Sequence, residues 1–136
     1  MLRKPRIVCV DDRQDSLAVR KRLLEQFGYD VVAVTYAQDC LLAVTRQEVD
    51  LVIIDYHLSG GIKGDELAHD IRTCRSEVPL IMLTGDPAVP EKAKASVDAV
   101  LIKGMSNPTD LLALIQTLLP HTTIRQPGDP RVPGTP

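Results

Sequence analysis

The stretch Leu51-Val52-Ile53-Ile54-Asp55 decides the fold of this chain, because four apolar residues in a row end at a carboxylate. Three other apolar runs end at polar groups in the same way: residues 7–10 at Asp11 and Asp12, residues 80–83 at Thr84, and residues 99–102 at Lys103. Short runs of this kind, rich in β-branched residues, predict strands that are buried in a parallel sheet.

The polar residues that follow these runs are expected to share one edge of the sheet. In open parallel sheets the ligand crevice lies outside the carboxyl ends of the strands. The sequence therefore brings three carboxylates, one hydroxyl and one ammonium to a single rim. These are the kinds of group that are needed to take up a phosphoryl group.

Helices and one more strand are predicted between these runs. Residues 16–27 form a helix that Gly28 ends, and residues 30–34 form a second strand. The last helix begins with Asn107 as N-cap and Pro108 at the first helical position. Five strands alternating with five helices, the fourth of them short, predict a three-layer α/β sandwich.

The spacing of apolar residues predicts which side of each helix faces the sheet. The first two helices carry apolar residues at Val19, Leu23, Leu24, Phe27, Leu41, Leu42 and Val44, and the third has Leu67, Ile71 and Cys74 at core spacing. In the last helix one stripe needs Leu111, Leu114, Ile115 and Leu118, which leaves Leu112 and Leu119 toward the flank or solvent. That helix is either broadly buried or a contact surface for a second subunit, and a homodimer through it is our hypothesis.

Composition places the chain in a broad class. Its 136 residues suit one domain, and a formal net charge of −2 gives no bias toward nucleic acid or an anionic membrane. No apolar run is long enough to span a membrane and no signal-peptide core is evident, so a cytoplasmic protein is expected. The three cysteines Cys9, Cys40 and Cys74 are expected in or near the core, as reduced thiols.

At the level of motifs, the order strand-Asp-Asp, strand-Asp, strand-Thr and strand-Lys resembles the receiver domain of two-component response regulators. The resemblance covers roughly residues 4–120. It implies a flavodoxin-like, doubly wound, five-stranded parallel sheet of order 2-1-3-4-5 in an α/β/α sandwich. A receiver is not an enzyme for other substrates, because it catalyses only its own phosphorylation and dephosphorylation.

The acidic residues define the chemistry that is expected. An aspartate can act as the nucleophile of phosphoryl transfer, and Asp55 is the candidate because it alone ends the central strand. Three carboxylates against Lys103 leave the rim at −2, which would repel a phosphoryl group, and a divalent cation removes that repulsion. Mg²⁺, or Mn²⁺, is therefore the expected cofactor.

The family resemblance implies a role for each residue of the rim. Asp55 would be the phosphoacceptor, and Asp12, Asp55 and the backbone carbonyl of His57 would bind the metal directly. Asp11 would act through a water molecule. Thr84 would donate its hydroxyl to one phosphoryl oxygen, and Lys103 would pair with another.

Each residue also has an ordinary structural explanation. An Asp-Asp pair before a helix is often an N-cap, a lysine at a strand end is usually solvated, and a threonine there is usually part of a turn. Their joint occurrence at four strand ends favours the site. For His57, His69 and His121 the spacing matches no metal site, so no imidazole ligand is expected.

The sequence departs from the family pattern near the expected output face. Val100 stands where the family usually has an aromatic residue, and Gly104 follows Lys103 where proline is usual, so a trans bond is expected there. The interval from Thr84 to Lys103 is about three residues shorter than is usual in the family. The loop from Asp55 to Gly64 is one residue longer than usual. These differences leave the phosphorylation chemistry in place and predict an altered output face.

Residues 1–120 are thus expected to form the receiver domain and residues 121–136 a Pro/Gly-rich tail or linker. The expected partners are a sensor histidine kinase or histidine phosphotransfer protein and a downstream protein, with no nucleic acid or membrane. Within this class, both a phosphorelay shuttle and a diffusible effector remain open. The alternatives are a phosphorylation-independent interaction module and, more remotely, an aspartate-nucleophile phosphatase.

Overall fold

The computed structural model describes residues 3–58, 60, 62–104 and 107–119, and within them strands and helices alternate as predicted. The expected tail at 121–136 lies outside the described residues. The strands are β1 (Arg6–Val10), β2 (Asp30–Val34), β3 (Leu51–Asp55), β4 (Leu80–Thr84) and β5 (Ala99–Ile102). The helices are α1 (Gln14–Gln26), α2 (Ala37–Arg46), α3 (Gly64–Cys74), α4 (Glu91–Ala95) and α5 (Pro108–Leu118).

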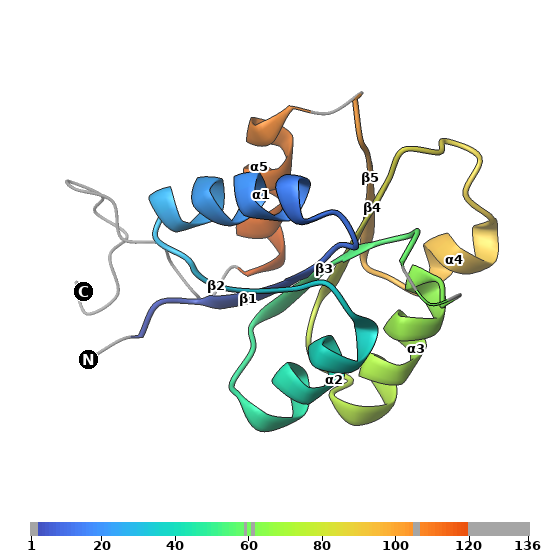
Figure 1. The fold of residues 1–136 in the computed structure, drawn as a ribbon, viewed down its shortest axis with the longest axis horizontal. Helices are drawn as coiled ribbons and strands as arrows, with labels where there is room; N and C mark the ends of the chain where they lie inside the picture. Colours follow the sequence, from blue (N-terminus) through green and yellow to red (C-terminus); the bar gives the residue numbers. More distant parts are fainter. Residues whose placement is uncertain (1–2, 59, 61, 105–106, 120–136) are drawn as a thin grey trace.

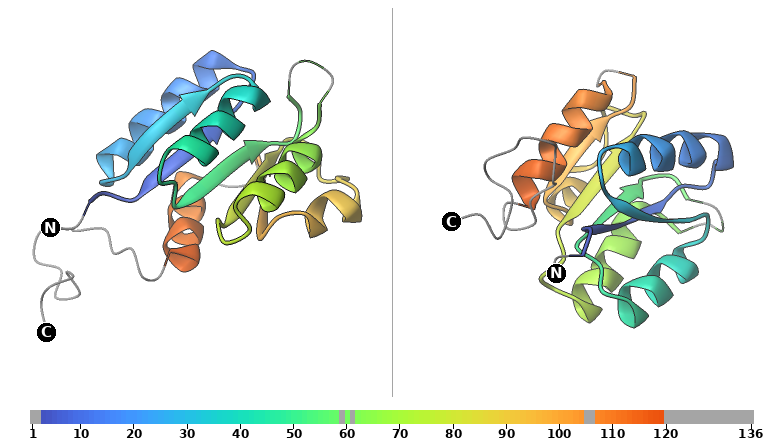
Figure 2. Two further views of the ribbon diagram at one scale, coloured as in Figure 1. Left: turned by 90° about the horizontal axis from the view of Figure 1, so that it is seen from below. Right: turned by 90° about the vertical axis from the view of Figure 1, so that its left-hand side faces the viewer.

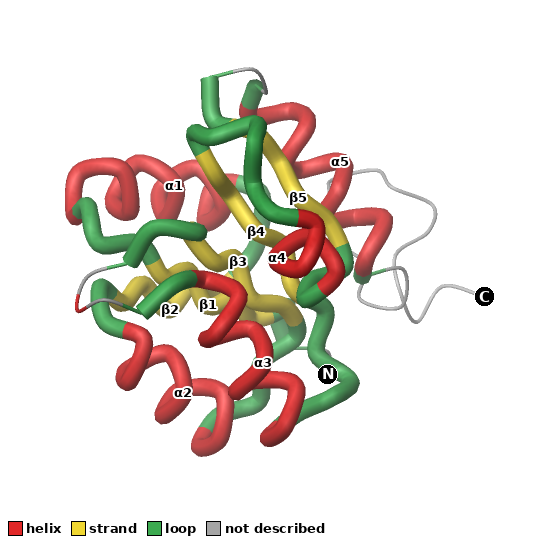
Figure 3. The backbone as a smooth tube through the Cα atoms, turned by 90° about the vertical axis from the view of Figure 1, so that its right-hand side faces the viewer, coloured by secondary structure: helices red, strands yellow, loops and turns green. Residues whose placement is uncertain are grey.

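The sheet has the order β2-β1-β3-β4-β5, and every neighbouring pair is parallel. This is the flavodoxin-like, doubly wound order that the family resemblance implied. Val10 pairs with Ile54, and Thr84 pairs with Ile102. The four strands that carry the predicted site residues therefore end at nearly the same level. Figure 3 shows the sheet between α1 and α5 on one side and α2 and α3 on the other.

Helices cover both faces of the sheet, with α1 and α5 on one side and α2 and α3 on the other (Figures 1 and 2). Alternate strand residues point into the two layers, as strand geometry requires. Ile7 and Cys9 belong to the core that contains the buried residues of α1 and α5. Val8 and Val10 belong to the core that contains those of α2 and α3. Both faces of β1 and β3 are thus buried, which explains their continuous apolar sequence.

Cys74, which we expected in or near the core, is on the surface, and so are three other apolar residues in or next to the helices. Val19 is 71% exposed, and Phe27, Leu42 and Cys74 are also exposed. In α1 the buried residues are Leu17 and Leu24, which lie seven positions apart and hence on one stripe. Successive helix residues are about 100° apart, so Val19 points roughly 200° away from Leu17 and faces outward.

The core face of α5 is wider than the single stripe that we predicted. Leu112 and Leu119 are buried beside Leu111 and Ile115, so their expected position toward solvent was wrong. Leu114 is partly buried against the same core, which also contains residues of α1, β3 and β4. The leucines of α5 therefore pack within the domain, and the homodimer hypothesis loses the apolar surface on which it depended.

The elements around α4 and α5 have the predicted ends. Asn107 Oδ1 accepts a hydrogen bond from the Asp110 N–H at 3.0 Å, and Asp110 Oδ2 accepts one from the Asn107 N–H at 3.0 Å, which makes a capping box. Helix α4 has five residues, as short as expected. The Lys103–Gly104 peptide bond is trans, and Gly104 has a φ of 82°.

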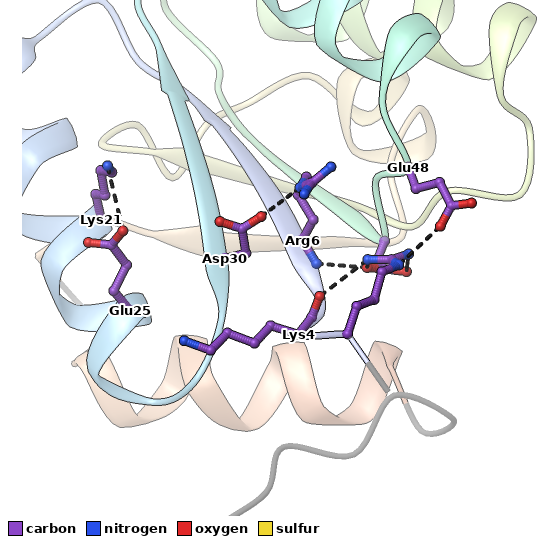
Figure 4. A network of polar contacts seen from close by, with 8 residues as sticks. Lys4, Arg6, Lys21, Glu25, Asp30 and Glu48 are labelled. Carbon is purple, nitrogen blue, oxygen red and sulfur yellow. Dashed lines mark hydrogen bonds and ion pairs between the residues drawn. The ribbon is translucent and has the colours of Figure 1, made fainter. Parts of the chain in front are cut away.

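Charged side chains gather at the opposite edge of the sheet, where β1, β2 and β3 begin (Figure 4). The Arg6 side chain lies 2.6 Å from Asp30, and the Arg6 backbone N–H donates to Asp50 at 2.7 Å. These groups are partly exposed, so they join the strand starts without forming a second site. No helix in the described part of the chain has the length and apolar content needed to cross a lipid bilayer.

Candidate functional site

The residues that follow β1, β3 and β5 meet at the carboxyl edge of the sheet. One carboxylate oxygen from each of Asp11, Asp12 and Asp55 lies within 4.8 Å of the others. Lys103 Nζ lies 3.2 Å from Asp55 Oδ1 and 3.5 Å from Asp11 Oδ2. The structure thus brings together the three acids and the lysine that the sequence placed on one rim.

Burial differs among the three acids and shifts their pKa values. Asp11 is fully buried and Asp55 is 6% exposed, whereas Asp12 is exposed. Burial raises the pKa of Asp55; Lys103 opposes that rise and the Asp11 carboxylate adds to it. Burial also favours protonated Asp11, but the Arg13 backbone N–H and the cations Lys103 and Arg20 outweigh it, so the pKa of Asp11 is lowered.

Asp11 is held on both of its oxygens. Oδ1 accepts a hydrogen bond from the Arg13 N–H at 3.0 Å, and Oδ2 accepts one from Arg20 Nη1 at 3.3 Å. Arg20 was not expected in the site from the sequence, because an arginine in the middle of a helix is usually solvated. The available signal was its position on α1, the helix that starts directly beyond Asp11 and Asp12.

Thr84 is fully buried at the end of β4, next to Asp55 on the neighbouring strand. Its Oγ1 accepts a hydrogen bond from the Asp86 N–H at 3.0 Å. The Thr84 carbonyl accepts one from the Lys103 N–H at 2.7 Å, which joins the ends of β4 and β5. The hydroxyl is therefore fixed at the rim, where the sequence placed it.

The chain after Asp55 folds back over the end of β3. The Gly64 N–H donates to the Tyr56 carbonyl at 2.8 Å, and His57 forms an isolated antiparallel bridge with Lys63. A Cβ at Gly64 would lie 2.8 Å from the Asp55 carbonyl oxygen and 2.9 Å from Tyr56 Cα, so only glycine fits this approach. His57 is thereby placed directly beyond the site, with its side chain exposed.

The donor set suits a hard divalent cation. Asp11, Asp12 and Asp55 offer only carboxylate oxygens, which Mg²⁺ and Mn²⁺ prefer, and nitrogen and sulfur donors are absent from this cluster. Asp12 is open to solvent, and Asp55 is poorly stabilised as an anion by its surroundings. A divalent cation between them would offset the desolvation of Asp55.

Beside the site, Val100 lies on β5 in a small core with Tyr56 and Met82, covered by Val89 and by Ala93 of α4. The residue next to Asp55, Tyr56, therefore packs beneath α4, close to the position at which the family usually has its aromatic residue. An exposed aromatic side chain at residue 100 is absent from this face, as the sequence indicated.

Comparison with known proteins agrees with this architecture. The model of the response regulator receiver domain family matches residues 7–116. The sensor protein GacS of Pseudomonas syringae pv. syringae is 29% identical over 136 residues, which is 95% of this chain and 15% of GacS. The regulatory protein PhoP of Bacillus subtilis is 25% identical over 126 residues, 90% of this chain and 52% of PhoP. The chain thus spans a small part of the sensor proteins that it matches.

Solved structures show the same fold. A CheY-like receiver domain from Methanospirillum hungatei has a TM-score of 0.79 and 30% identity, covering 88% of this chain and 96% of that one. The response regulator TrrA of Thermotoga maritima, in complex with Mg²⁺ and BeF, has a TM-score of 0.78 and 27% identity, covering 85% and 99%. With its sheet order, its acidic cluster and a family match over most of its length, this chain belongs to the response regulator receiver domains of two-component systems.

Proposed function

We propose that this domain accepts a phosphoryl group on Asp55 in a reaction that depends on Mg²⁺ and thereby changes its contacts with other proteins. The observation that carries the proposal is the position of Lys103 Nζ, 3.2 Å from Asp55 Oδ1, in a cluster of three carboxylates. Asp55 supplies the nucleophilic oxygen. Lys103 beside it supplies a positive charge, and the three carboxylates can hold a cation that neutralises the phosphoryl group during transfer.

In the proposed reaction an Asp55 carboxylate oxygen attacks the phosphorus atom of the donor. The new bond gives an acyl phosphate, and the bond from phosphorus to the donor breaks with its electron pair leaving on the donor atom. That donor atom is an imidazole nitrogen of a phosphohistidine, or the carboxylate oxygen of a small acyl phosphate. Hydrolysis ends the phosphorylated state: water attacks the phosphorus, the bond from phosphorus to Asp55 breaks, and inorganic phosphate and the Asp55 carboxylate are released.

The other residues of the site hold the phosphoryl group in position and neutralise its charge. Asp12, Asp55 and the His57 carbonyl are proposed as direct ligands of the cation, and Asp11 as a ligand through water. The bound cation supplies neutralisation of the phosphoryl oxygens. Lys103 pairs with one phosphoryl oxygen and the Thr84 hydroxyl donates to another, which keeps the group in line with Asp55.

The proposed partners follow from the relatives. GacS is named a sensor protein, and its likeness to this chain supports a histidine kinase or a histidine phosphotransfer protein as the donor. A phosphorelay shuttle and a diffusible effector use the same chemistry and differ in the acceptor partner. We propose residues 1–120 as the receiver domain, and residues 121–136 as a tail or linker.

The test is the intact mass of the protein after incubation with acetyl phosphate. The expected result is one added phosphoryl group that requires Mg²⁺ and is lost in Asp55→Asn. Asp39→Asn is the matched control, because Asp39 is an exposed aspartate on α2, outside the site. If nothing is added, beryllofluoride binding separates a receiver that accepts phosphate only from its kinase from a domain that signals without phosphate.

A further inference from the structure

Arg20 is a second cation in the acidic site. It belongs to α1, its side chain is 11% exposed, and its Nη1 lies 3.3 Å from Asp11 Oδ2. In the part of the chain that the structure describes, the Arg20 guanidinium donates one hydrogen bond, and its acceptor is Asp11. A largely buried positive charge is costly unless a carboxylate neutralises it, and Asp11 provides that carboxylate.

Asp11 Oδ2 is shared by two cations. Lys103 Nζ lies 3.5 Å from this oxygen, slightly farther than Arg20, and is closer to Asp55, at 3.2 Å. Asp11 Oδ1 is occupied by the Arg13 N–H. Arg20 therefore supplies Asp11 with a counter-ion that is separate from the ion pair between Lys103 and Asp55.

The second cation changes the charge of the site. Three carboxylates (−3) with Lys103 alone (+1) give −2, and with Arg20 included (+2) they give −1. The attraction of the site for a divalent cation is weakened accordingly, because each positive charge in a partly buried cluster opposes the incoming one.

We propose that Arg20, held beside the acidic cluster by its ion pair with Asp11, lowers the affinity of the site for Mg²⁺ by its charge. The inference rests on the proposed function, since it assigns the acidic cluster to a divalent cation. Arg20 touches neither the phosphoryl group nor the metal; it acts through Asp11. The consequence is a receiver that binds Mg²⁺ less tightly than the same acidic cluster would without Arg20.

The side chain of Arg20 also lines a groove of about 460 Å³ between α1, the end of β5 and the start of α5. Lys103, Ser16 and Asn107 line it together with apolar residues such as Leu23 and Leu111. The groove leaves space beside the Arg20 stem, so an unbranched uncharged side chain can replace it without compressing the core.

The experiment measures Mg²⁺ affinity by calorimetric titration, without any phosphodonor. Arg20→Met removes the charge and keeps an apolar stem, while Arg20→Gln removes the charge and keeps a shorter, polar side chain. Both are expected to bind Mg²⁺ about tenfold more tightly than the original protein, because one nearby positive charge is gone. Arg20→Lys restores the charge and is expected to restore the original affinity.

Arg22→Met is the matched control, because Arg22 is an exposed arginine on the same helix. It makes the same change in net charge, and its affinity is expected to stay within about twofold, since a solvated charge is screened. Circular dichroism and thermal unfolding without Mg²⁺ show which variants are folded. Arg20→Gln carries the test if Arg20→Met does not fold.

Unchanged or weaker Mg²⁺ binding in folded Arg20→Gln and Arg20→Met would overturn the inference, because a merely structural arginine would loosen Asp11 when removed. The proposed function would survive that result if the original protein still binds Mg²⁺ and is phosphorylated. If neither the original protein nor any variant binds Mg²⁺, both the inference and the Mg²⁺-dependent function fail.

Discussion

Lys103 Nζ lies 3.2 Å from Asp55 Oδ1, although β5 and β3 are not neighbours in the sheet. The lysine side chain reaches past the end of β4, and its backbone N–H is anchored on the Thr84 carbonyl at 2.7 Å. The ion pair therefore ties the outermost strand to the central one at the place where phosphoryl transfer is proposed. The Lys103 side chain is 32% exposed, so it can turn toward a ligand.

Lys103→Ala is expected to separate metal binding from phosphorylation. Mg²⁺ affinity should stay the same or rise, because a competing cation is removed, while the rate of phosphorylation by acetyl phosphate should fall by about a hundredfold. Calorimetric titration gives the first quantity and a time course of intact mass gives the second. Lys92→Ala, an exposed lysine on α4, is the control. Lost Mg²⁺ affinity in Lys103→Ala would contradict the charge argument.

His57 and Asp86 are expected to affect how long the phosphate lasts. Both side chains are exposed beside the site, and Asp86 follows Thr84 by two residues. His57→Ala and Asp86→Ala should each slow dephosphorylation by about threefold to tenfold, because a group that orients water is lost. The measurement is the decay of the phosphorylated mass after the donor is removed.

Asp86 also has a structural contact, since its Oδ1 accepts a hydrogen bond from the Ala88 N–H at 2.9 Å. Asp86→Asn keeps an oxygen for this bond and removes the charge, so it separates the two effects. Unaltered decay in His57→Ala and Asp86→Ala would remove the idea that these residues direct water.

The strands could be predicted from the sequence because each central strand is buried on both faces, and their order followed from the family resemblance. A continuous apolar run such as 51–54 leaves no choice of face, and the observed strand extends it by one residue to Asp55. The helix faces were harder. Val19 and Leu17 are both apolar, and the choice between them depends on how α1 is rotated on the sheet. That rotation is set by packing partners far away in the sequence.

The grouping of Asp11, Asp12, Asp55, Thr84 and Lys103 followed from strand ends alone, because parallel strands bring their carboxyl ends together. Arg20 could not be found that way. It approaches the site from the side of a helix, and its guanidinium reaches Asp11 only in one orientation of a long side chain. Backbone topology predicts the position of a strand-end residue far better than that of a long helical side chain.

Gly64→Ala is expected to destabilise the fold by roughly 2–3 kcal/mol, because overpacking against backbone cannot be relieved by a rotamer change. The added Cβ would lie 2.8 Å from the Asp55 carbonyl oxygen. Gly85→Ala is the control: a Cβ there has no neighbour within 4 Å, so its effect should stay within about 0.5 kcal/mol. Urea unfolding monitored by circular dichroism measures both. Equal stability of the two variants would show that the loop after Asp55 can move away from Gly64.

Cysteine reactivity tests whether the cores on the two faces of the sheet are closed to solvent, because Cys9 lies in one and Cys40 in the other. Burial raises the pKa of both Cys9 and Cys40 to about 12, whereas Cys74 is exposed at the end of α3. The thiolate is the reactive form, so a thiol reagent at pH 8 should modify one cysteine in the folded protein and three after denaturation. Cys74→Ser should leave no fast-reacting thiol. Because Cys9 lies on β1 two residues before Asp11, rapid modification of a second thiol would mean that the strand carrying the acidic site opens readily.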